Sequence, residues 1–170
     1  MANPAFMSIE GEVQGLLTSG AGTEDSVGTG FVDQHDDEFM VFAFDHEVFI
    51  PRDPHSGQPT GNRVHQPLTV TKNFDKCSPL LYNALTTGER LSRCELKFYR
   101  ISAVGEEHFY TVVLENALIV GINATMPHVL DKSMDAYTPQ ERISLSYSNI
   151  VWTHVVAGTE GSDDWRIKRA

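Results

Sequence analysis

Prolines and glycines interrupt the chain repeatedly between residues 51 and 67, and no other segment limits its fold as strongly. The interruptions are Pro51, Pro54, Gly57, Pro59, Gly61 and Pro67. Each proline lacks a backbone donor, so neither a helix nor an inner strand can pass through this spacing. Structureless connections longer than about 12–15 residues are uncommon unless they are functional or disordered. The segment is therefore either an arm that docks on another molecule or a flexible surface loop.

Composition indicates an ordinary soluble globular protein. The 170 residues are 41% hydrophobic and 21% charged, enough for one domain, residues 1–170, with a buried core. The formal net charge of -10 argues against nucleic acid and anionic membranes as partners. The sequence does not begin with the basic residues and apolar stretch that are typical of a signal peptide. No apolar run approaches the ~20 residues of a membrane span. Cys77 and Cys94 are predicted to be core thiols.

Alternating apolar and polar residues predict a mainly β protein. Residues 68–74, 91–101, 106–122 and 143–156 read as strands, with the third bent around Glu115 and Asn116. Residues 6–10 and 13–17 are predicted to form one bent edge strand. The apolar run 39–44 predicts a strand covered on both faces, with Phe42 and Phe44 on the core side and Val41 and Ala43 on the other.

One helix is predicted, over residues 78–87. Ser78 offers a hydroxyl cap, Pro79 suits the first helical position and Gly88 ends the helix. The apolar face expected for this helix contains Leu80, Leu81, Ala84 and Leu85.

The remaining segments are predicted to be loops and a tail. Residues 20–30 superficially resemble a phosphate-binding loop but lack its Lys-Ser/Thr pair, so a mobile polar loop is favoured. Residues 35–38 are interpreted as a solvated charged turn, and residues 123–140 as a loop. Trp165, in the polar tail 157–170, is expected to pack back on the body as an anchor.

No motif requires an active site. The chain has no G-x-S-x-G, no H-E-x-x-H and no C-x-x-C, so we predict no catalytic residue, no metal and no cofactor. One alternative remains, a metal-dependent barrel enzyme that uses His46, His55 or His65.

Four segments carry a family resemblance. They are PAFMSIEGEVQGLLTSGAGTEDSVG, HEVFIPRDPHSGQPTGNRVHQPLTVTKNFDKCSPLLYNALTTGERL, HFYTVVLENALIVGI and WTHVVAGTEGSDDW. In this order they resemble the haemolysin-coregulated protein (Hcp) family, which forms the tail tube of the bacterial type VI secretion system. The HEVxIPRDxxSGxPTGxRxHxP stretch is the most specific. The resemblance implies a compact two-sheet β-barrel with one flanking helix and a long extended loop, assembling into hexameric rings.

The resemblance also implies partners and functional residues. Rings would stack into a hollow tube whose lumen carries effector proteins, with spike and sheath or baseplate components as further partners. The tube would be assembled in the bacterial cytoplasm and then secreted without a cleavable signal peptide. Residues 45–67 would reach towards the adjacent ring, and Ala43 would face the lumen. The implied ring-stacking residues are Phe49, Ile50, Pro51, Arg52, Asp53, Pro54, His55, Ser56, Gly57, Gln58, Pro59, Thr60 and Gly61.

A different class of function stays open. The chain could be a monomeric barrel that binds a small ligand or a metal, with the proline-rich segment as a lid over its mouth.

Overall fold

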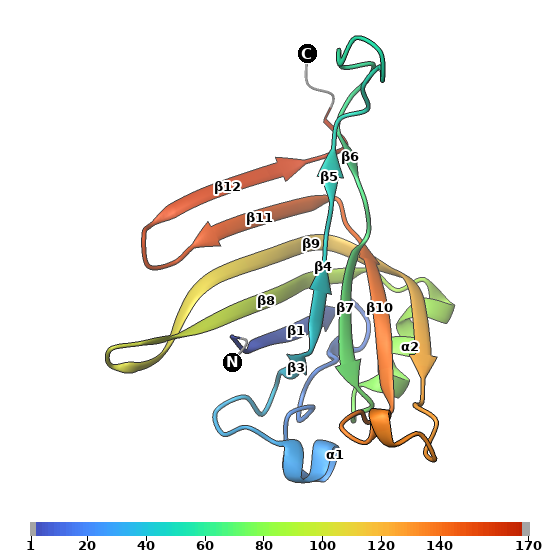
Figure 1. Ribbon diagram of the computed structural model, residues 1–170, viewed down its shortest axis with the longest axis vertical. Helices are drawn as coiled ribbons and strands as arrows, with labels where there is room; N and C mark the ends of the chain where they lie inside the picture. The colour runs from blue at the N-terminus through green and yellow to red at the C-terminus, as the bar shows by residue number, and fades with distance from the viewer. Residues whose placement is uncertain (1–2, 168–170) are drawn as a thin grey trace.

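A computed structural model describes residues 3–167 and confirms a mainly β fold with one flanking helix and a long extended loop (Figure 1). The strands are β1 (Ala5–Gly11), β2 (Gly15–Leu16), β3 (Phe39–Val41), β4 (Ala43–Asp45), β5 (Val48–Phe49), β6 (Val64–His65), β7 (Leu68–Asn73), β8 (Leu91–Ser102), β9 (Gly105–Thr125), β10 (Gln140–Ser146), β11 (Asn149–His154) and β12 (Thr159–Asp164). The helices are α1 (Glu24–Val27) and α2 (Ser78–Thr87), with 3-10 turns η1 (Gly28–Gly30) and η2 (Lys132–Met134). None of the described helices is long and apolar enough to cross a membrane.

The long strand β9 belongs to both halves of the sheet structure. As far as Ala117 it pairs with β8 and β11, and from Leu118 onward it pairs with β10. The bend between the halves is at Asn116, which has a positive φ of 52°. Asparagine tolerates this left-handed conformation better than most residues. The predicted bend around Glu115 and Asn116 is confirmed.

The segment 39–44 was predicted wrongly, because it is two strands that belong to different halves. β3 pairs with β1, the chain turns at Phe42, and β4 pairs with β7. Because of this turn, the side chains that a single strand would bury are exposed. Phe39 and Val41 are buried, whereas Phe42 and Phe44 are exposed. The turn at Phe42 also links the two ends of the strand order, so the structure curls around its core.

Two further strand predictions are corrected at turns. Residues 5–16 form a hairpin of β1 and β2, and β1 is not an edge because β8 pairs with its other side. Residues 143–156 belong to β10 and β11, which separate at Tyr147 and Ser148. The polar tail is also partly a strand, because β12 pairs with β11. Residues 168–170 of the predicted tail 157–170 lie outside the described residues.

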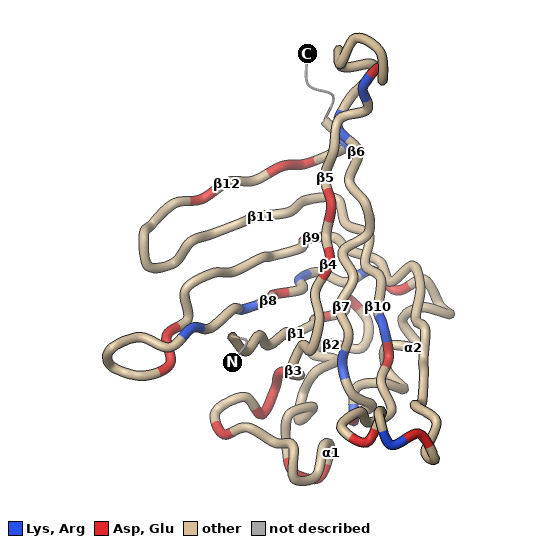
Figure 2. The backbone as a smooth tube through the Cα atoms, viewed as in Figure 1, with Lys and Arg blue, Asp and Glu red and all other residues tan. Residues whose placement is uncertain are grey.

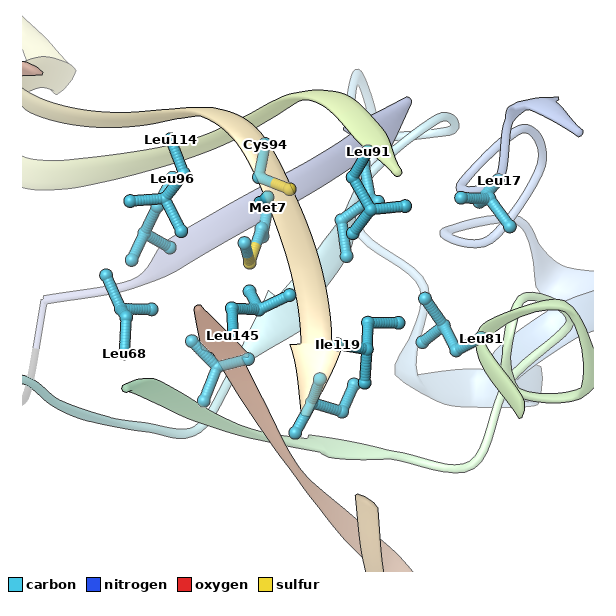
Figure 3. Packing of buried hydrophobic residues seen from close by; sticks show 14 of the residues in the cluster. Met7, Leu17, Leu68, Leu81, Leu91, Cys94, Leu96, Leu114, Ile119 and Leu145 are labelled. Atoms are coloured by element: carbon cyan, nitrogen blue, oxygen red, sulfur yellow. The ribbon is translucent and has the colours of Figure 1, made fainter. Parts of the chain in front are cut away.

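The helix α2 has the predicted bounds and covers one end of the core. Leu81 and Ala84 are buried, and Gly88 ends the helix in a left-handed conformation, φ 68°. Figure 3 shows side chains of the two halves meeting, with Leu81 beside them. These side chains include Met7, Cys94, Leu96 and Leu114 from one half and Leu68, Ile119 and Leu145 from the other. Each buried leucine stabilises the fold by about 1.5–3 kcal/mol.

A buried ion cluster lies beside the start of α2. The Nζ of Lys72, on the core face of β7, lies 2.5 Å from Oε1 of Glu141 and 2.9 Å from Oδ1 of Asp75. Ser78 was predicted to cap the helix with its hydroxyl, but the N-cap is Cys77, and the Ser78 hydroxyl donates to Glu141 instead, at 2.6 Å. The cluster ties β7 and β10 to the helix.

The segments before β3 are more ordered than predicted. Residues 20–30 contain the short helix α1. His35 was placed in a solvated turn, but its ring is buried and stacks on Phe6 with centroids 3.6 Å apart. An aromatic partner that is distant in the sequence therefore overrides the local polar pattern. Both cysteines are buried free thiols, as predicted, and burial raises the pKa of Cys94 to about 12.

Candidate functional site: an anchored arm

The proline-rich segment is an ordered hairpin. β5 pairs with β6, so Val48 lies opposite His65 and Phe49 opposite Val64. Beyond them Arg52 bridges to Pro59, and the amide of Thr60 donates to the carbonyl of Pro51 at 2.8 Å. Figure 1 shows this hairpin projecting from the body at one end of the longest axis. We call residues 48–65 the arm. A lid would fold across the body, whereas the arm points away from it.

The tip of the arm is closed by its own polar groups. The carboxylate of Asp53 accepts hydrogen bonds from the amides of His55 and Ser56, at 2.7 and 3.3 Å. The carbonyl of Asp53 accepts from the amide of Gly57 at 2.8 Å, and Gly57 has a φ of 73° that favours glycine. These bonds hold the turn without any contact to a hydrophobic core.

The arm leaves apolar side chains in solvent. Val48, Phe49, Ile50 and Val64 are all exposed, and Ile50 is 55% exposed. Of the thirteen residues predicted to act in ring stacking, only Pro51 and Asp53 are half-buried and the others are exposed. The structure brings them together as one continuous projection. An ordered projection with exposed apolar side chains is typical of an interaction element.

A chain of hydrogen bonds fixes the base of the arm. Nδ1 of His65 lies 2.6 Å from the Tyr147 hydroxyl, and Nε2 of His46 lies 2.7 Å from the same hydroxyl. On its other side, Nε2 of His65 lies 2.8 Å from Oδ2 of Asp163. Arg63 binds Asp163 with two nitrogens, at 2.7 and 2.9 Å. The arm is thereby held against β12 and the turn between β10 and β11.

The proton positions in this chain follow from the chemistry of its members. Asp163 is ionised, because the bonds from Arg63 and then from His65 lower its pKa to about 2. A carboxylate only accepts, so Nε2 of His65 donates to it. In a neutral His65, Nδ1 then accepts from the Tyr147 hydroxyl, whose oxygen accepts from Nε2 of His46. The arrangement suits two neutral imidazoles.

Burial favours a neutral His46. Burial, followed by the charge of His65, lowers the pKa of His46, and the carboxylate of Asp45 opposes the shift. Burial, followed by the charge of Asp163, raises the pKa of Tyr147, so its hydroxyl keeps the proton. The Arg63 guanidinium, hydrogen-bonded to Asp163, has its pKa raised and stays charged.

The histidines of the metal alternative are not gathered into one site. His46 and His65 share Tyr147, whereas His55 lies at the tip of the arm. Within residues 3–167 no group of three or more histidine, cysteine, aspartate or glutamate side chains could hold a metal ion. The metal-dependent alternative therefore has no structural support in the described chain.

Ala43 lies in β4, opposite Thr71 of β7, and is exposed. The next residue, Phe44, packs edge-on against Phe98 with ring centroids 5.4 Å apart. Ala43 is thus on an accessible surface outside the arm.

Comparison with known proteins identifies the family of this chain. The family described as "Type VI secretion system effector, Hcp" matches residues 6–154. The chain belongs to the Hcp family. It is 56% identical over 167 residues to the "Major exported protein" of Pseudomonas aeruginosa, a match that covers 98% of this chain and 97% of that protein.

Solved structures of the Hcp family share the fold. A crystal structure titled "Crystal structure of Hcp protein" is 47% identical, with a TM-score of 0.94, and the match covers 98% of this chain and all of that one. The secreted protein Hcp3 from Pseudomonas aeruginosa is 50% identical, with a TM-score of 0.82, over 98% and 100% of the two chains.

The residues of this Hcp family member that hold the base of the arm are far apart in the sequence. Tyr147 and Asp163 lie 101 residues from His46 and 100 residues from Arg63, respectively. No local pattern connects such distant positions. Trp165 was predicted to anchor the tail, and its indole N–H does donate to the carbonyl of Tyr147. The sequence does place His46 and His65 on either side of the prolines of the arm, but nothing in it indicates that they share a tyrosine partner.

Proposed function

We propose that this chain is a structural subunit, without catalysis, that assembles into hexameric rings which stack into a hollow tube. The observation that carries the proposal is the arm. It is ordered by its own hydrogen bonds and fixed at its base, yet its apolar side chains are exposed and lie outside the core cluster. Ordering such side chains in solvent has no benefit for a monomer, whereas docking of a rigid arm loses little entropy.

Membership of the Hcp family supports the proposal. Two relatives are named as an exported and a secreted protein. We infer that this chain is also secreted, through a type VI machine whose spike and sheath or baseplate components are its partners, and that effector proteins travel in the tube lumen. Strand edges support ring closure, because β12 pairs on one side only within the described chain and a neighbour could pair with the other.

Deletion of residues 55–60 tests the role of the arm. These residues contact no core residue, so the variant should form rings but should lose stacking and secretion. Electron microscopy of the purified variant reads ring formation and stacking separately. An unfolded variant would show that the tip belongs to the fold, and a variant that stacks like wild type would remove the arm from the function.

A substitution at Ala43 tests the lumen role that we propose for this residue. Ala43→Gln places a longer polar side chain on the exposed surface of β4 and should weaken retention of an effector protein while rings persist. Co-purification of the effector with wild-type and variant rings measures the difference. Equal co-purification would exclude Ala43 from the cargo surface.

A further inference from the structure

The loop between β9 and β10 presents large apolar side chains to solvent. Within residues 126–139, Val129 is 76% exposed and Leu130 is 82% exposed. The other exposed apolar residues of this loop are Met126, Met134 and Tyr137. Gathered apolar side chains of this size mark an interaction surface on a soluble protein. We call residues 126–139 the receiver loop.

Polar bonds hold the receiver loop in one conformation. The Asp131 carboxylate accepts from the amide and the hydroxyl of Ser133, at 3.0 and 2.6 Å, at the start of η2. The amide of Tyr137 donates to the carbonyl of Met134 at 2.9 Å, and the carbonyl of Pro139 accepts from Phe74 at 3.3 Å. Met126, Val129, Met134 and Tyr137 border a hollow of about 260 Å³, and Leu130 lies outside its lining. The loop is therefore built to keep this surface open.

The receiver loop and the arm lie at opposite ends of the molecule. Figure 1 shows the arm at the top of the longest axis and the receiver loop, in orange, at the bottom. A contact between one end of a chain and the other end of a second copy is heterologous and repeats without limit when it does not close. This placement suits growth of a stack in one direction.

The two surfaces carry exposed charges of opposite sign. Figure 2 shows that basic and acidic residues both occur in the arm and at the opposite end of the molecule. Arg52 and Asp135 are both exposed, and no oppositely charged side chain lies within salt-bridge distance of either one in the described chain. In the arm Asp53 follows Arg52, and its carboxylate is hydrogen-bonded to the amides of His55 and Ser56. In the sequence, Arg52 is two residues from the exposed Ile50 of the arm, and Asp135 follows the exposed Met134 of the loop. Asp131 adds a second carboxylate to the loop, and Lys132 between them opposes it. A guanidinium and a carboxylate beside an apolar contact give both affinity and register.

We propose that the receiver loop of a second copy is the surface on which the arm docks, with Ile50 against its apolar residues and Arg52 facing Asp135. This inference rests on the proposed function, because it names the partner surface of the arm. The occupant is the arm of an identical chain. Other apolar surfaces, such as the turn at Val104, are the competing receivers.

Charge reversal tests the pairing of Arg52 with Asp135. Arg52→Asp or Asp135→Arg alone should raise the protein concentration needed for stacking by about tenfold or more, and the double variant should restore it. Asp33→Arg is the matched control, since Asp33 is also exposed and makes no ion pair in the described chain. Sedimentation velocity measures stacking, and ring formation is read from the same data.

The apolar contact has its own pair of variants. Leu130→Asp should abolish stacking, whereas Val104→Asp, at a residue that is 98% exposed, should stack like wild type. An Arg52→Cys, Asp135→Cys protein should form a ladder of disulfide-linked chains on oxidation, because both native cysteines are buried.

The outcomes separate the inference from the proposed function. Two results would overturn docking on the receiver loop and leave the proposed tube intact. One is normal stacking of Leu130→Asp rings. The other is a charge-reversed double variant that does not recover stacking, together with a double cysteine variant that forms no disulfide-linked ladder. A wild-type protein that forms no rings at any concentration would overturn both.

Discussion

The hydroxyl of Tyr147 lies 2.6 Å from Nδ1 of His65, although 82 residues separate them in the sequence. Tyr147 sits where β10 gives way to β11, at a turn between the two halves of the fold. His65 ends the returning strand of the arm. The direction in which the arm points is therefore set by a turn of the body, and a change at Tyr147 should act on the arm.

Tyr147→Phe should loosen the arm. The substitution leaves two partly buried imidazole nitrogens without the hydroxyl they share, at a cost of about 1–3 kcal/mol. We expect faster hydrogen exchange in β5 and β6 and a lower free energy of unfolding in urea. Tyr137→Phe is the control, because Tyr137 is exposed in the receiver loop. Equal exchange in Tyr147→Phe and wild type would show that the hydroxyl does not hold the arm.

Acid should also loosen the arm. The folded pKa of His46 lies below the 6.5 of the unfolded chain, so unfolding takes up protons and neutral His46 stabilises the fold fully above pH 6.5. That contribution is lost as the pH falls from 6.5 through the lowered pKa.

Hydrogen exchange of the arm, corrected for its intrinsic pH dependence, measures this effect. Protection should fall between about pH 7.5 and about pH 5, and His46→Gln should flatten the change. Protection that is equal at the two pH values would contradict the account. Asp163 acts in the same direction at lower pH, since its contribution is present above 3.8 and is lost towards 2.

Arg63→Leu should raise the pKa of Asp163. The largest cause of its lowered value is the hydrogen bond from Arg63, and the hydrogen bond from His65 has a smaller effect. Carboxyl NMR titration should find the pKa moved from about 2 towards 3.8. Arg166→Leu is the matched control, because Arg166 pairs with Asp164 and not with Asp163. An unchanged Asp163 pKa would place its stabilisation elsewhere.

Lys72→Met should destabilise the whole fold. It removes the cation between two buried carboxylates, Asp75 and Glu141, and breaking a buried pair in this way costs about 3–5 kcal/mol. Urea unfolding measures the loss, with exposed Lys76→Met as the control. Adding Glu141→Leu should recover part of the loss. A stability within error of wild type would mean that the cluster is not held as described.

Local patterns predicted those parts of the fold that depend on neighbouring residues. The helix α2 needs only Pro79, an apolar face and Gly88, and these are all close in the sequence. The bend of β9 at Asn116 was likewise visible as a break in an apolar run. Strands that stay in one half of the fold, such as β7 and β8, lie within one residue of the predicted ranges.

Local patterns failed where the chain passes from one half of the fold to the other. At the turn at Phe42 the pairing partner changes, because β3 before it pairs with β1 and β4 after it pairs with β7. The turn also reverses which side chains are buried. Alternation cannot reveal such a turn, because both strands remain apolar. The contacts that hold the arm could not be predicted for a related reason. Tyr147 and Asp163 come close to the arm only when the whole chain has folded.

The state of the purified wild-type protein in solution shows whether the chain assembles into stacking rings. Light scattering after size-exclusion chromatography, with negative-stain images of the same fractions, gives the mass and the shape together. We expect a particle of six chains of 18.9 kDa that appears as a ring, with stacked rings at higher concentration. A single chain at every concentration and in every buffer, with no annular particles, would contradict it.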